Sequence, residues 1–338
     1  MITEFILNDK LAFVQAFPQI RNPDDTLITK AESHVTSSWW RFYCTMQGHY
    51  GMPSIYGHHV IVRLTALQHV GGWDETKVAE DWSTSTRMLV GGWQGKFIDY
   101  GTDDPNMVSG EMSPPTLEGQ QKQKNKWATG ATELIRDSLA GWMRSPLPWH
   151  YRFGLLIRLT SFPTTSLRLV GQLLVLMWIV FAGLNGENSP ALDYALLSAA
   201  MLSAWLVYWA AVSITYAREG NASKALGILI FVPVQMAYTL SIMPHILHGV
   251  YKGMRYAINT FVITPKRIEY HSSIWRLVVN QRVALAMAVL FASPSLLLPF
   301  DVPGYVRYAA LSMLFSSLMT VLGVLLVPVT QWLRELSR

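Results

Sequence analysis

The sequence predicts an α/β domain followed by membrane α-helices, and three observations support this fold class. First, 51% of the 338 residues are hydrophobic and only 14% are charged, whereas soluble domains carry about 25% charged residues. Second, the charges concentrate before residue 168, and long uncharged apolar runs follow it. Third, short apolar runs bounded by turn-forming residues recur in the first part of the chain, as is typical of buried strands.

Residues 1–132 are interpreted as mixed α/β. The run "LAFVQAF" at 11–17 predicts a buried strand, 56–67 predicts a strand that enters a helix, and 95–101 predicts a strand flanked by glycines. Cys44 is the single cysteine, so the chain can form no intrachain disulfide.

Residues 133–165 change in character. This segment mixes arginines, tryptophans and leucines and is broken by prolines. Aromatic and basic residues of this kind gather at the level of lipid headgroups. The segment therefore predicts helices that lie in the membrane interface.

Residues 166–338 are interpreted as a transmembrane region, because a run of about 20 apolar residues can cross a bilayer. A further apolar run, 225–247, is interrupted by Pro233 and Pro244 and is interpreted as interfacial or re-entrant. About four transmembrane helices are predicted, within the uncharged runs 169–186, 194–217, 283–300 and 308–333.

Lysine and arginine placement predicts the orientation in the membrane. The linker 185–193 contains neither residue and is expected outside, whereas 218–224 and the basic segment at about 252–282 are expected in the cytoplasm. The sequence thus predicts a multi-pass protein of the inner membrane with its α/β part in the cytoplasm. The mild net charge of +5 favours a membrane surface or an anionic substrate over nucleic acid.

Glu80 and Asp81 form the first candidate site. They follow a Gly-Gly-Trp-Asp turn at 71–74 and begin a segment with helical spacing. Acids in the first turn of a helix complement its dipole, which is the structural interpretation. A carboxylate at this position can also act as a general base that takes a proton from a sugar hydroxyl.

Gln123, Lys126 and Trp127 form the second candidate site, on one turn of a predicted helix. An indole can stack on the apolar face of a sugar ring, and an amide and a cation can bind hydroxyl or phosphate oxygens. The alternative is a basic helix face at the membrane surface with a tryptophan anchor. A third stretch, "FVITPK" at 261–266, is by itself ordinary loop material.

Taken together and in this order, the motifs resemble those of the membrane-embedded, processive glycosyltransferases of family 2, which include cellulose, hyaluronan and chitin synthases. "AED" at 79–81 resembles the family's Thr-Glu-Asp motif, and "QKNKW" at 123–127 resembles Gln-x-x-Arg-Trp. "FVITPK" resembles the gating loop of the cellulose synthases. Residues 13–19 and 56–75 resemble two further family segments, so the resemblance covers essentially the whole chain.

The resemblance implies an inverting enzyme that elongates a polysaccharide and exports it through its own helices. Asp81 matches the catalytic base, and Glu80 matches its neighbour in the motif. Gln123, Lys126 and Trp127 match the residues that hold the acceptor end and the donor diphosphate. The residues matching the loop that closes over the nucleotide are Phe261, Thr264, Pro265 and Lys266.

The chain departs from the family pattern in three ways. Ala79 replaces the motif threonine, and Lys126 replaces an arginine, so a bidentate fork becomes a point charge. The Asp-x-Asp motif that binds the metal is missing, because "PDD" at 23–25 and "TDDP" at 102–105 lack its spacing and position. We therefore expect the C-terminal part of a GT-A-type domain. Mg or Mn is implied for the intact enzyme only, with no ligands in this chain.

The expected partners are a nucleotide sugar (a UDP-sugar), a glycan acceptor, the lipid bilayer and an accessory subunit. Two alternatives share the chemistry: non-processive transfer to a lipid acceptor, and a catalytically incomplete half-enzyme. A membrane transporter or channel is the alternative from another class. It is disfavoured because the four predicted spans contain no charged residue, which ion-coupled transport usually needs.

Overall fold

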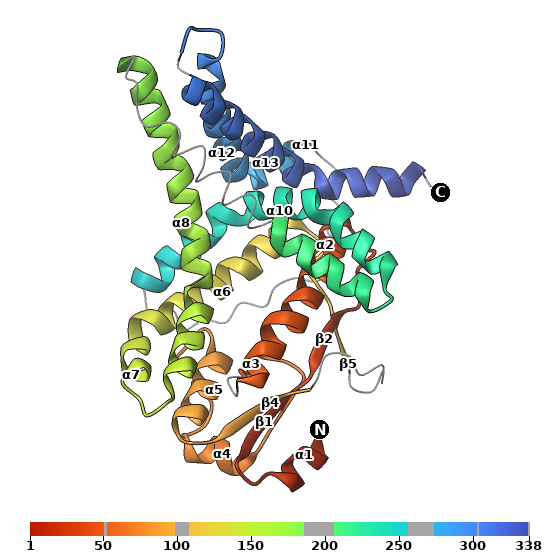
Figure 1. The fold of residues 1–338 in the computed structure, drawn as a ribbon, viewed down its shortest axis with the longest axis vertical. Helices are drawn as coiled ribbons and strands as arrows, with labels where there is room; N and C mark the ends of the chain where they lie inside the picture. The colour runs from red at the N-terminus through yellow and green to blue at the C-terminus, as the bar shows by residue number, and fades with distance from the viewer. Residues whose placement is uncertain (51–52, 99–107, 186–205, 256–273, 303, 337–338) are drawn as a thin grey trace.

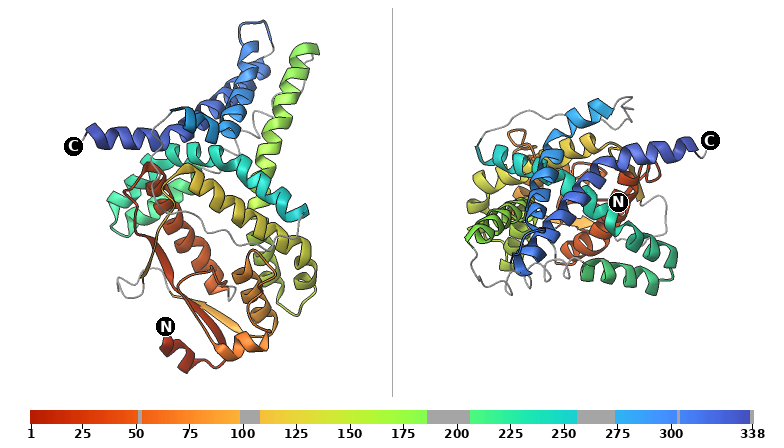
Figure 2. Two further views of the ribbon diagram at one scale, coloured as in Figure 1. Left: turned by 180° about the vertical axis from the view of Figure 1, so that it is seen from behind. Right: turned by 90° about the horizontal axis from the view of Figure 1, so that it is seen from above.

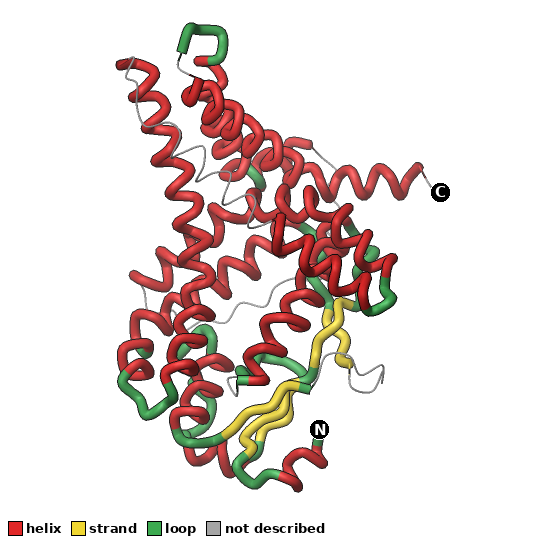
Figure 3. The backbone as a smooth tube through the Cα atoms, in the orientation of Figure 1, coloured by secondary structure: helices red, strands yellow, loops and turns green. Residues whose placement is uncertain are grey.

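The protein was analysed as a computed structural model. The structure describes residues 1–50, 53–98, 108–185, 206–255, 274–302 and 304–336. Its strands gather at one end of an elongated molecule, and helices form the remainder (Figures 1 and 3). The predicted combination of an α/β part with a helical part is confirmed in this coarse sense.

Two small sheets form the α/β part. The entirely buried strand β1 (Leu11–Gln15) lies between β3 (Val60–Val62), which is antiparallel to it, and β4 (Gln94–Phe97), which is parallel. In the second sheet, β2 (Phe17–Ile20) pairs in parallel with β5 (Val108–Glu111). An apolar strand with neighbours on both sides is the expected result for a run such as "LAFVQ". The strands predicted within 11–17, 56–67 and 95–101 are therefore present.

Side-chain caps mark where two long helices begin. Thr26 and Thr29 form a capping box at the start of α2, and the Thr116 hydroxyl accepts the Gly119 N–H at the start of α6. The described helices are α1 (Ile2–Leu7), α2 (Leu27–Trp39), the π-helix η1 (Trp40–Cys44), α3 (Thr45–His49), α4 (Leu64–His69), α5 (Glu80–Val90), α6 (Leu117–Asp137), α7 (Leu139–Met143), α8 (Trp149–Asn185), α10 (Ala222–Arg255), α11 (Ile274–Asn280), α12 (Arg282–Ala292), the 3-10 helix η2 (Ser293–Leu297) and α13 (Gly304–Leu336).

Two of the described helices are long and apolar enough to cross a membrane: α10, and residues 306–326 of α13. The predicted run 283–300 is instead α12 followed by η2, which together are too short for that test, because Pro294 ends the regular helix. The first half of run 194–217 lies outside the described residues. Four spans are therefore not established.

Helix α10 differs from the prediction for 225–247. Pro233 and Pro244 both lie inside one continuous helix of 34 residues. In Figures 1 and 2 this helix crosses beneath α12 and the first part of α13. The predicted boundary between 133–165 and the membrane region falls within another continuous helix, α8, which contains Pro163. Neighbouring helices can compensate the backbone groups that a proline leaves unpaired.

Helix α10 packs directly on α6, and two glycines allow this close approach. A Cβ atom added at Gly253 would lie 2.5 Å from the carbonyl oxygen of Thr129, and one at Gly249 would collide with the carbonyl oxygen of Asn125. Glycines spaced by four residues lie on one helix face, so the two backbones can meet there. The turn of α6 that holds the second candidate site is therefore seated on α10.

This contact can be tested with alanine substitutions. Gly253→Ala should lower the free energy of unfolding by about 1–3 kcal/mol, because the new methyl group overpacks the interface. Gly171→Ala in α8 is the matched control, because a Cβ there meets nothing within 4 Å. It should leave stability unchanged or raise it by up to about 1 kcal/mol. Thermal unfolding of the protein in detergent would measure both, and equal effects would contradict the close packing.

Candidate functional site

Asp81 lies half-buried in the first turn of α5. Its Oδ1 atom accepts the N–H of Trp82 at 2.8 Å, and a Cβ atom added at Gly57 would lie 3.0 Å from its Oδ2 atom. The pKa of the Asp81 carboxyl is raised to about 7, mainly because burial disfavours the charged form. The hydrogen bond from the Trp82 N–H lowers this pKa, and the negative charge of Glu80 raises it. A carboxyl poised near neutral pH suits a general base.

The start of α5 is anchored by residues other than Asp81. The Glu133 carboxylate on α6 accepts the Val78 N–H at 2.9 Å. The Ser83 hydroxyl donates to the carboxylate of Asp74, which holds the preceding turn. The Ala79 position that precedes the helix has no side-chain cap. The helix-cap interpretation of Asp81 accounts for the contacts of its carboxylate with the backbone N–H groups of Trp82 and of Asp81 itself.

Strand β1 shapes the turn that faces Asp81. The side chain of Gln15 is fully buried; its Nε2 atom donates to the His58 carbonyl at 2.7 Å and its Oε1 atom accepts the Tyr56 N–H at 3.1 Å. Gly57, between them, has a φ of 75°, in the left-handed region that favours glycine. The His58 ring points to β5, where its Nε2 atom lies 3.2 Å from the Glu111 carboxylate.

Helix α6 brings a cation to the two acids. A Cβ atom added at Gly130 would lie 2.8 Å from the Cβ of Ala79, so the small residues at these positions let α6 approach the start of α5. Lys126 lies one turn before Gly130 on α6. Burial lowers the pKa of Lys126, while the charges of Glu80 and Asp81 oppose that effect. The structure thus gathers Glu80, Asp81 and Lys126 from two motifs that lie more than 40 positions apart.

Trp127 follows Lys126 and projects outward, with 43% of its surface exposed. The Nζ atom of Lys124 lies 4.3 Å from the centroid of its ring, at cation–π distance. Gln123 is partly exposed and lies four residues before Trp127, on the same side of α6. An exposed indole with a cation over its ring and an amide on the same side of the helix is an arrangement that can bind a sugar.

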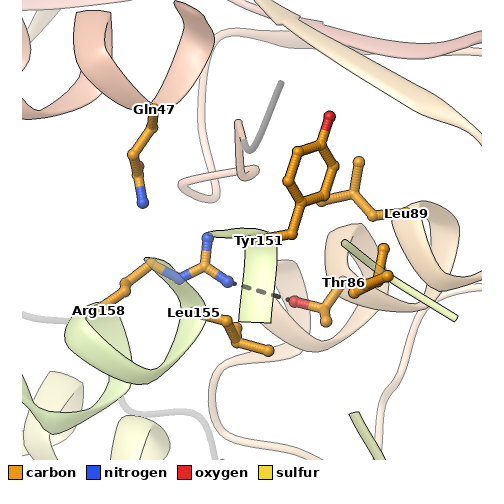
Figure 4. A pocket seen from close by; sticks show the side chains of 7 residues that line it. Gln47, Thr86, Leu89, Tyr151, Leu155 and Arg158 are labelled. Atoms are coloured by element: carbon orange, nitrogen blue, oxygen red, sulfur yellow. Dashed lines mark hydrogen bonds between the residues drawn. The ribbon is translucent and has the colours of Figure 1, made fainter. Parts of the chain in front are cut away.

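Arg158 of α8 is a residue that our sequence interpretation missed. Its side chain is 5% exposed, its Nη2 atom donates to the Thr86 hydroxyl at 3.3 Å, and its guanidinium carbon lies 5.3 Å from the centroid of the Trp82 ring. Its Nε atom has no hydrogen-bond partner within the described ranges. An arginine inside the apolar stretch "FGLLIRLTSF" was the available signal. Figure 4 shows the small pocket beside it, which is lined by Gln47, Thr86, Leu89, Leu147, Tyr151, Leu155 and Arg158.

The third motif cannot be placed. Phe261, Thr264, Pro265 and Lys266 lie outside the described residues. The metal implied by the resemblance also finds no fit in the described part of the chain, where no three His, Cys, Asp or Glu side chains group closely enough to hold an ion. The adjacent acids Glu80 and Asp81 have an ammonium group beside them instead.

The chain is similar to several known proteins. The chain is 29% identical over 202 residues to a probable glycosyltransferase of Sulfolobus acidocaldarius, a match covering 60% of the chain and 40% of that protein. It is 30% identical over 140 residues to glucomannan 4-beta-mannosyltransferase 9 of Arabidopsis thaliana, covering 38% of the chain and 23% of the relative.

A third relative is the poly-beta-1,6-N-acetyl-D-glucosamine synthase of Staphylococcus epidermidis, which is 29% identical over 139 residues, or 40% of the chain and 32% of the synthase. The matches thus span less than half the length of each of these relatives. The sequence profile of glycosyl transferase family group 2, in contrast, matches residues 1–330, almost the entire chain. The chain therefore belongs to glycosyl transferase family group 2.

Proposed function

We propose that this chain carries the acceptor side of an inverting glycosyltransferase that elongates a polysaccharide from a nucleotide sugar. One observation carries the proposal: Asp81, held at a pKa of about 7, lies close to the ammonium of Lys126, and the next residue on the same helix is the exposed Trp127. The names of the relatives support a polymer product, since one makes glucomannan and another makes poly-N-acetylglucosamine.

In the proposed reaction, the Asp81 carboxylate takes the proton of an acceptor hydroxyl. The hydroxyl oxygen then attacks the anomeric carbon of the donor sugar, and the bond from that carbon to the diphosphate oxygen breaks on the opposite face. One displacement of this kind inverts the anomeric configuration. The positive charge of Lys126 offsets the negative charge that develops on the departing diphosphate.

The acceptor end is held by Trp127 and Gln123 in this proposal. The indole stacks on the ring of the terminal sugar, and the amide binds its hydroxyl groups. The resemblance leads us to propose that residues 261–266 contact the nucleotide of the donor. We propose a UDP-sugar as that donor. The apolar helices α10 and α13 support an association with a membrane. We propose that the site lies at the cytoplasmic face of the inner membrane and that the polymer leaves between the helices of a multi-pass protein.

The direct test uses protein expressed from its native locus and purified in lipid nanodiscs. UDP-glucose, UDP-N-acetylglucosamine and GDP-mannose are supplied in turn, and the released nucleotide and the product length are measured. Nucleotide release together with products that lengthen with time supports the proposal. A single sugar on a lipid-extractable acceptor would overturn elongation, and no release from any donor would overturn the glycosyl transfer itself.

The pH dependence of transfer is a further expected result. Only the ionised form of Asp81 can accept a proton, so kcat/KM should rise with pH through about 7 and then level off. Glu80→Gln should shift this midpoint to lower pH, because the charge of Glu80 raises the pKa. Arg158→Met should shift it to higher pH, because the guanidinium lowers the pKa. Shifts in the same direction would contradict the assignment of the titrating group to Asp81.

A further inference from the structure

A buried polar chain connects three helices behind the second candidate site. The Glu32 side chain on α2 is only 5% exposed. Its Oε1 atom lies 3.0 Å from the Nζ atom of Lys124 on α6 and accepts the hydroxyl of Tyr238, on α10, at 2.6 Å. One oxygen of the carboxylate is therefore contacted by groups from two different helices.

The series of contacts from Tyr238 through Glu32 to Lys124 ends at Trp127. The ammonium of Lys124 contacts Glu32 and also lies over the indole ring, 4.3 Å from its centroid. Lys124 is one helical turn before Trp127, so the two side chains occupy neighbouring positions on α6. If the Glu32–Lys124 ion pair served only to join α2 to α6, it would need no contact with an exposed indole. A tryptophan that is 43% exposed has less packing to select one ring orientation than a core residue has, and a fixed cation on one face adds to that selection.

We propose that Glu32 and Tyr238 are positioning residues for Trp127. They hold the Lys124 ammonium against one face of the indole, which leaves the opposite face to stack on the terminal sugar of the acceptor. The apolar helix α10 thereby helps to set the geometry of the sugar platform through Tyr238, whose side chain is 1% exposed. The sugar-binding part of this inference rests on the proposed function.

The orientation of Trp127 can be measured without any activity. The full chain is labelled with 5-fluorotryptophan in detergent micelles, and its ¹⁹F signal is assigned among the thirteen tryptophans by its loss in Trp127→Phe. Lys124→Met and Glu32→Gln should each shift or split the Trp127 signal. Lys122→Met is the matched control, since Lys122 is an exposed lysine on the same helix, and it should leave the signal unchanged. An unchanged Trp127 signal in Lys124→Met overturns the positioning.

Sugar binding supplies the second readout. Calorimetric titration with mannohexaose, cellohexaose and chitohexaose identifies the oligosaccharide that the wild type binds best. Lys124→Met should weaken its binding by about three- to tenfold, and Lys124→Arg should restore it, because the arginine keeps a cation over the ring. Tyr238→Phe, which keeps the packing of α10, should weaken binding to a smaller extent.

Combination with Trp127→Ala separates a positioning role from a general loss of stability. If Lys124 acts through Trp127, adding Lys124→Met to Trp127→Ala should cause no further loss of affinity. Additive losses overturn the inference. The wild type can also fail to bind any of the three oligosaccharides while Lys124→Met still shifts the Trp127 signal. That result supports the positioning of Trp127 and overturns its sugar-binding role.

Discussion

Asp81→Asn should lower the rate of sugar transfer by at least about 100-fold, the size of effect that general-base catalysis typically contributes. Asparagine keeps the shape of the side chain but cannot take up the acceptor proton. The measurement is nucleotide diphosphate release by the protein in nanodiscs at pH 8, where the carboxyl is ionised. Asp9→Asn is the matched control, because Asp9 is exposed and lies far from the site in the sequence, before β1.

Stability distinguishes this outcome from misfolding. The folded state raises the pKa of Asp81 from 3.8 to about 7, so the fold favours the neutral form. Its contribution to stability is fully present below about pH 4 and is lost as the pH rises to about 7. Asp81→Asn should therefore unfold at a temperature equal to or above that of the wild type at pH 8. A variant that is active at pH 8 would return Asp81 to the role of a first-turn helix acid.

Trp127→Ala should nearly abolish transfer to a glycan acceptor. One face of an indole offers on the order of 100 Å² for stacking, worth about 2–3 kcal/mol, or about 30- to 150-fold in kcat/KM for the acceptor. The change should leave hydrolysis of the donor by water much less affected. Initial rates with and without an oligosaccharide acceptor would measure the two effects separately.

Two companion variants sharpen this experiment. Trp149→Ala removes an indole of α8 that is more exposed than Trp127, at 72%, and should retain acceptor transfer. Lys126→Arg restores the family arginine and should keep or raise activity. If Trp127→Ala remains active while Trp149→Ala loses activity, the stretch at 119–130 is a membrane-surface helix and the sugar site lies elsewhere.

Local pattern was sufficient for the strands and insufficient for the membrane helices. The apolar run at 11–17 and the segment 56–67 predict β1 and β3, because short apolar runs bounded by turn residues are typical of buried strands. Apolar length alone also predicted a span at 283–300, which becomes α12 followed by η2 at Ser293 and Pro294. The prolines Pro233 and Pro244 predicted an interruption of the apolar run 225–247, but both lie inside the single helix α10. Whether a proline breaks a helix depends on its tertiary neighbours.

The residues of the candidate site divide in the same way. The order and spacing of the motifs were enough to select Glu80, Asp81 and Lys126, because residue type and sequence order are local properties. Their meeting depends on the contact between Gly130 and Ala79, which no spacing rule reports. The proton affinity of Asp81 likewise depends on burial, which the chain acquires only when its elements pack together.

The supporting residues come from still more distant positions. Gln15 shapes the turn at Gly57, Arg158 reaches α5 from α8, and Glu32 meets Lys124 across 92 positions of sequence. The sequence by itself determined the family of this protein and selected Asp81 and Trp127 as the candidate base and the candidate sugar platform, since these depend on which residues occur and in what order. Only the tertiary structure decided which groups surround them, because the electrostatic and packing energies that tune a site depend on distances between segments that are remote in the chain.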